Sequence, residues 1–138
     1  MSAPYSDEAR RWLLFARADL EAGHHNVASG RFHHIACFHA QQAAEKCLKA
    51  VLVWSGIDPP RIHDLDELRD LIPDGWAVRE AFPDLAALSF WAVHGRYPGE
   101  WLDISTDEAA SLVETADALF AHVLEDLGSR GFERGEAL

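Results

Sequence analysis

Apolar residues recur every three or four positions along almost the whole of this 138-residue chain. Such spacing collects them on one side of an α-helix, and no convincing run shows the alternation that is typical of a half-buried strand. The pattern predicts an all-α protein. Because 49% of the residues are hydrophobic and the length is close to that of a common domain, the chain can bury one core.

Five helices are predicted, and each has local start or stop signals. Ser6, Asp64 and Ser105 are expected to cap helix N-termini, while Gly30 ends the first helix. Three long helices with short connections fit an antiparallel bundle of four to five helices. We expect one domain over residues 1–138, with its core at about 7–127 and a frayed tail at 128–138. The predicted helices are 7–28, 31–54, 64–71, 84–94 and 106–127.

Several classes of protein are disfavoured by composition. The start of the chain lacks a signal-peptide pattern and no apolar run is long enough to span a membrane, so a cytoplasmic protein without a membrane partner is expected. A net charge of −11 argues against broad nucleic-acid binding, which depends on Lys and Arg. Cys37 and Cys47 are expected in the core, and we expect no metal and no cofactor, since Glu21-x-x-His24 has no second copy.

The second predicted helix carries an unusual set of polar residues. Gln41, Glu45 and Lys49 are spaced four apart and therefore share one face, with Gln42 and Lys46 on the neighbouring row. One interpretation is a solvated face with a favourable Glu45–Lys49 pair. The other is a polar site at a cleft or a dimer interface, because apolar residues take up both flanks of this helix. The sequence leaves the two interpretations open.

Three segments resemble the signatures of the HEPN family, in the family's order. Residues 38–50, FHAQQAAEKCLKA, are similar to its second helix, His63-Asp64-Leu65 to its short third helix, and Arg96-Tyr97-Pro98 to the segment after its fourth. The resemblance spans roughly residues 10–127. It implies a helical bundle that forms a homodimer and works beside a minimal nucleotidyltransferase, often as a toxin–antitoxin pair.

Many members of the family are metal-independent ribonucleases, in which an Arg and a His with four to six residues between them cleave RNA. No His follows Arg96 within that range here, and Arg17 and His24 have that spacing only on the first predicted helix. Whether the chain is an enzyme therefore stays open. The leading hypothesis is a dimeric nucleotide-binding or nucleotidyltransferase-partner module. Its candidate ligand-binding residues are Gln41, Glu45, Lys49, His63, Arg96 and Tyr97.

Two alternatives remain beside that hypothesis. The first is an RNA-cleaving toxin with an atypical active site, in which Arg96, His63 and His39 take part as phosphate-binding and proton-transferring groups. The second is a dimeric scaffold without a small-molecule ligand, in which the polar row on the second helix serves packing specificity.

Overall fold

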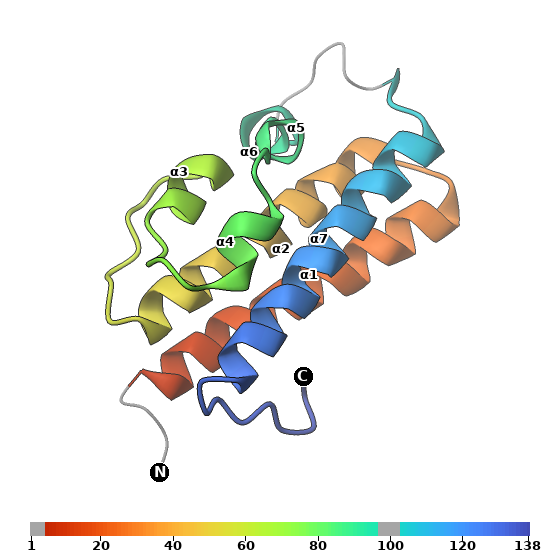
Figure 1. The fold of residues 1–138 in the computed structure, drawn as a ribbon. Coiled ribbons are helices and arrows are strands. Elements are labelled where there is room, and N and C mark those ends of the chain that lie inside the picture. The colour runs from red at the N-terminus through yellow and green to blue at the C-terminus, as the bar shows by residue number, and fades with distance from the viewer. Residues whose placement is uncertain (1–4, 97–102) are drawn as a thin grey trace.

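Three long helices lie side by side and form the body of the protein (Figure 1). The computed structural model describes residues 5–96 and 103–138. α1 (Ser6–Ser29) and α2 (His33–Trp54) make an antiparallel hairpin, and α7 (Thr106–Gly128) packs against both. The predicted all-α bundle is confirmed. None of the described helices combines the length and the apolar character that a membrane-spanning helix needs.

α2 is the central helix of the bundle, as predicted. Small side chains such as Ala36, Ala40 and Ala44 are fully or almost fully buried along it, which lets α1 and α7 approach closely. Cys37 and Cys47 are buried free thiols in the same core. Desolvation by burial raises the pKa of Cys37 to about 12 and also raises that of Cys47.

Within the described residues, four short helices cover one side of the long ones (Figure 1). α3 (Leu65–Asp70) and α6 (Trp91–His94) contact α2, α5 (Ala86–Ser89) contacts α2 and α3, and α4 (Ala77–Ala81) contacts α7. The single helix predicted over residues 84–94 is therefore two helices, which meet at Phe90. The two helices are held by different contacts. In α5 the Ser89 hydroxyl accepts a hydrogen bond from the Leu65 amide, whereas α6 packs on α2.

α4 was not predicted, and its start depends on a distant residue. The carboxylate of Asp126, on α7, accepts hydrogen bonds from the amides of Ala77 at 3.3 Å and Val78 at 2.8 Å. Two predicted caps are confirmed: Asp64 accepts from the Glu67 amide and Ser105 from the Glu108 amide. Ser6, by contrast, is the first residue of α1 and its side chain makes no capping bond.

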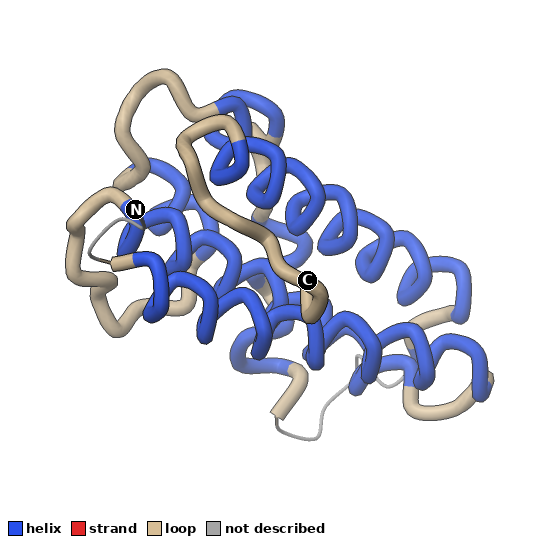
Figure 2. The backbone as a smooth tube through the Cα atoms, turned by 90° about the horizontal axis from the view of Figure 1, so that it is seen from below, coloured by secondary structure: helices blue, strands red, loops and turns tan. Residues whose placement is uncertain are grey.

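The tail after α7 was expected to fray, but it folds back along α1 without forming a helix (Figure 2). Phe132 is buried, its ring lies edge-on to Trp54 at 5.8 Å, and the Arg10 guanidinium lies over it at 4.8 Å. Arg10 also donates to the Arg134 carbonyl at 2.7 Å, and Arg17 donates to the Leu138 carbonyl at 3.2 Å. A short apolar anchor and two arginines therefore hold a segment whose composition alone suggested disorder.

Candidate functional site: a buried polar row on the central helix

Gln41, Glu45 and Lys49 form one connected row, and all three are buried on α2. The Gln41 side-chain amide donates to Oε1 of Glu45 at 3.1 Å, and the Lys49 ammonium donates to Oε2 of the same carboxylate at 3.0 Å. Gln42 adds a bond to the Gln41 oxygen at 2.7 Å. The predicted shared face is confirmed, but the interpretation as a solvated surface is wrong because these side chains are at most 9% exposed.

His63 joins this row from the loop between α2 and α3. Its Nδ1 lies 2.9 Å from Oε1 of Glu45, and its backbone carbonyl accepts from the Gln41 amide at 3.3 Å. The imidazole is half-exposed while the carboxylate that it contacts is buried. Because Nδ1 is held by Glu45, the other ring nitrogen, Nε2, is the one left for an external partner.

The charge on Glu45 is stabilised from three sides. Burial acts to raise the pKa of its carboxyl, but hydrogen bonds from His63, Gln41 and Lys49 outweigh that effect and lower the pKa below its ordinary value. Glu45 and Lys49 therefore form an ion pair that cancels in net charge. The row is polar without being cationic.

A second, similar cluster lies between α1 and α2, and sequence reasoning missed it. Asp19 on α1 contacts Nδ1 of His39 at 2.9 Å through one oxygen and the Lys46 ammonium through the other. Burial raises the pKa of Asp19, but the bonds to His39 and Lys46 lower it to a net value below the ordinary one. The opposite charges of Asp19 and Lys46 on neighbouring predicted helices were the available signal.

Arg96 lies at the N-terminal end of the same face of α2. Its guanidinium carbon is 5.2 Å from the centre of the Phe38 ring, and Phe38 stands one helical turn before Gln42. Gly95 makes this approach feasible, because a Cβ at that position would lie 2.6 Å from Cβ of Phe38. Tyr97, the remaining candidate, lies outside the described residues.

Comparisons with known proteins decide the family. The sequence matches the HEPN domain family over residues 9–127. The chain belongs to the HEPN family. A crystal structure of the protein TT1696 from Thermus thermophilus has a similar fold, with a TM-score of 0.74 and 27% sequence identity over 86% of this chain and 97% of that one. No curated protein shows significant sequence similarity to this chain.

Within this HEPN domain, the groups considered for RNA cleavage are held by separate contacts. His63 contacts Glu45, His39 contacts Asp19, and Arg96 stacks on Phe38. The Arg17 and His24 spacing does not produce a pair either. Arg17 binds Glu21 and the Leu138 carbonyl, whereas His24 contacts Asp117 on α7 at 2.7 Å.

Potential metal ligands are dispersed over the described part of the fold. Within residues 5–96 and 103–138, no three His, Cys, Asp or Glu side chains are placed to hold a metal ion. The polar row itself offers hydrogen bonding by its own side chains and by His63, with cationic contact by Arg96 at one end.

Proposed function

We propose that this HEPN domain is a homodimeric binding module that takes a nucleotide and works with a minimal nucleotidyltransferase, as one half of a toxin–antitoxin pair. The observation that carries the proposal is the position of His63. A buried carboxylate holds its Nδ1 and the ring is half-exposed, which leaves Nε2 for a ligand, while Arg96 lies over Phe38 on the same helix.

Each exposed group suits contact with a nucleotide. Arg96 offers a planar set of donors that matches phosphate oxygens, and its side chain is exposed even though the guanidinium stacks on Phe38. His63 can donate or accept through Nε2. Gln41, Glu45 and Lys49 are assigned a positioning role instead, because their polar groups already bind one another and the His63 carbonyl.

A second candidate function is metal-independent RNA cleavage at an atypical site. It is favoured by one feature, the Glu45–His63 contact, since a carboxylate that orients an imidazole suits proton transfer. In this alternative Arg96 would stabilise the developing phosphate charge, with His39 as a further participant. The two functions differ in whether RNA is consumed.

Nucleotide binding is tested by titrating the purified protein with ATP and with AMP in a calorimeter. Arg96→Ala and His63→Ala are each expected to weaken binding about tenfold or more, the loss of one charge-assisted contact. Arg31→Ala is the matched control, because Arg31 also stacks on a phenyl ring, that of Phe32 at 4.8 Å, but lies in the loop before α2 and makes no contact with the polar row. Equal binding by wild type, Arg96→Ala and His63→Ala would contradict the proposal.

RNA cleavage is tested in the same preparations. Wild type and Arg96→Ala are incubated without metal on structured and on single-stranded RNA, and the products are scored for cyclic-phosphate ends. Cleavage that disappears in Arg96→Ala would replace the binding role by the ribonuclease role. Intact RNA together with nucleotide binding is the result expected here.

A further inference from the structure

Three aromatic side chains and one glutamate form a row along one face of α1, beginning at Tyr5, the residue before the helix. Tyr5, Glu8, Trp12 and Phe15 follow one another at steps of three, four and three residues, the spacing of a helix seam that meets another helix. Phe15 is 65% exposed and Tyr5 47%, and no large hydrophobic side chain among the described residues is more exposed than Phe15. An exposed aromatic seam of this kind marks a surface that is covered by a partner.

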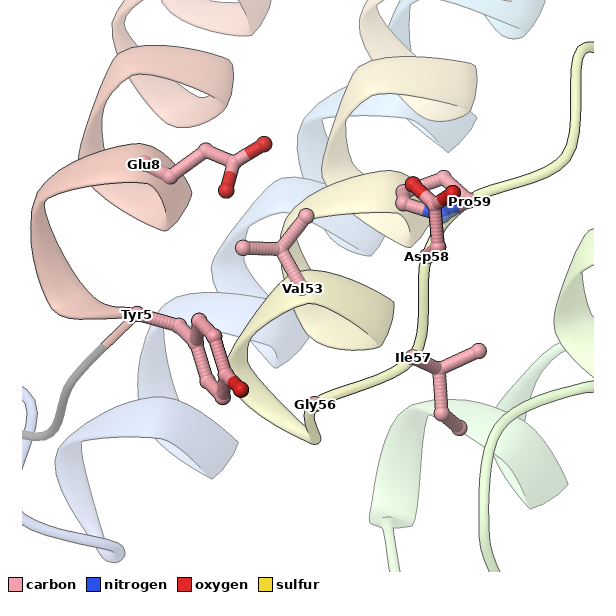
Figure 3. Close-up of a pocket in the computed structure, with 7 residues that line it drawn as sticks. All are labelled: Tyr5, Glu8, Val53, Gly56, Ile57, Asp58 and Pro59. Atoms are coloured by element: carbon pink, nitrogen blue, oxygen red, sulfur yellow. The ribbon is translucent and has the colours of Figure 1, made fainter.

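The seam is hollowed by two adjoining cavities that share Glu8. The first, of about 280 Å³, is lined by Arg11, Trp12, Phe15 and Glu8. The second has a volume of about 210 Å³ and lies between the start of α1 and the end of α2. Figure 3 shows Tyr5 and Glu8 reaching from α1 toward this end of α2, with Asp58 across the opening. We call the two cavities together the α1 furrow.

Three charged side chains line the α1 furrow. Arg11 lines the first cavity, whereas Asp58 lines the second and Glu8 lies at the junction. Within the described parts of the chain, these three side chains have neither an ion pair nor a hydrogen bond. The two lysines near the aromatic rings add no unpaired charge to the α1 furrow. Lys46 lies 6.0 Å from the Phe15 ring and Lys49 5.7 Å from the Trp12 ring, and each binds a carboxylate.

We propose that the α1 furrow is the surface through which two copies of this chain pair, with their α1 helices antiparallel about a two-fold axis. Such an axis brings the same patch together twice, so a patch with an Arg on one side of its centre and a Glu on the other complements itself. Arg11 of each copy then lies against Glu8 of its partner. The axis passes between these two positions, so Phe15 of each copy packs against Tyr5 of the other, and aromatic residues are enriched in dimer interfaces.

This inference rests on the homodimer of the proposed function and adds the surface that forms it. A single-stranded nucleic acid would also stack on aromatic rings, but two unpaired carboxylates in the furrow repel its phosphates. Burying the furrow against an identical copy instead gives Glu8 a cation, Arg11 of the partner copy. The charge pattern therefore favours a second copy of the chain as the occupant.

The test is the dimer dissociation constant, measured by sedimentation over a range of protein concentrations. Phe15→Glu is expected to weaken the dimer about a hundredfold, as loss of an interface anchor does. Leu71→Glu is the matched control, since Leu71 is also exposed, at 43%, but follows α3. Val93→Glu probes the competing apolar surface on α6, where Val93 is 56% exposed, and is expected to leave the dimer unchanged.

A charge exchange tests the antiparallel arrangement separately from folding. Arg11→Glu and Glu8→Arg should each weaken the dimer, and the double variant should restore it, because the two charges meet again with their signs reversed. A dimer that dissociates in Val93→Glu but not in Phe15→Glu would overturn the assignment of the surface and leave the dimer of the proposed function intact. A wild type that stays monomeric at every concentration would overturn both, whatever its nucleotide binding.

Discussion

Truncating Glu45 to alanine is the most direct test of the buried polar row. Three side chains donate to this carboxylate, at 3.1 Å from Gln41, 3.0 Å from Lys49 and 2.9 Å from His63. In Glu45→Ala the Lys49 side chain, only 9% exposed, keeps a charge without a partner. Breaking a buried ion pair in this way costs about 3–5 kcal/mol, a large share of the free energy of unfolding of a small domain.

The chain provides a matched control at the same helical spacing. Arg17 and Glu21 are also four residues apart, with a contact of 3.4 Å, but their side chains are 42% and 73% exposed. Glu21→Ala is therefore expected to change the free energy of unfolding by no more than about 1 kcal/mol, because solvent screens exposed pairs. The comparison tests burial together with the additional bonds from Gln41 and His63, since each pair lies within a single long helix, α1 or α2.

The assay is urea unfolding followed by circular dichroism, with the slope on denaturant checked for each variant. A double variant, Glu45→Leu with Lys49→Met, should regain part of the lost stability, because removing both charges leaves neither one buried alone. A loss below about 1 kcal/mol in Glu45→Ala, equal to that of the exposed control, would refute the claim that the row is a buried and internally satisfied network.

Three further outcomes follow from the same contacts. The pKa values of Glu45 and Asp19 are lowered by folding, so their contribution to stability is complete above about pH 4.5 and is lost on further acidification. When the pH is lowered, the free energy of unfolding of Glu45→Gln should therefore fall less steeply than that of the wild type. Gly95→Ala should destabilise the fold by about 1–3 kcal/mol and displace Arg96, because the new Cβ would lie 2.6 Å from Phe38 Cβ, whereas Gly128→Ala, with nothing within 4 Å, should be neutral or stabilising in the same unfolding assay. Both cysteines are buried thiols with raised pKa values, so iodoacetamide labelling followed by mass spectrometry should modify them only under unfolding conditions; rapid modification of the native protein would contradict that burial.

The long helices could be predicted because their signals are local. The caps at Asp64 and Ser105 bind amides three residues ahead, and Gly30 takes the left-handed conformation, with φ of 70°, that ends α1. α4 shows the limit of such signals. Its first amides bind Asp126, almost fifty positions later in the chain, so no pattern around Ala77 could indicate where it starts.

The candidate site, like the fold, could be predicted only where the signal is local to one helix. Spacing alone placed Gln41, Glu45 and Lys49 on one row, but their burial depends on the loop and the helix that fold over them. The contact of His63 with Glu45 joins residues eighteen positions apart, and that of Asp19 with His39 joins two helices. Helical periodicity fixes which residues of one helix share a face, whereas contacts between elements depend on their packing.

The two lysines set the electrostatics of any ligand site on α2. Lys46 and Lys49 are the only lysines in the sequence, and each binds a largely buried carboxylate. Neither charge is therefore free to meet a phosphate, and breaking either pair would leave a buried anion behind. In a chain of net charge −11, a nucleotide on this face would therefore depend on Arg96 for its cationic contact.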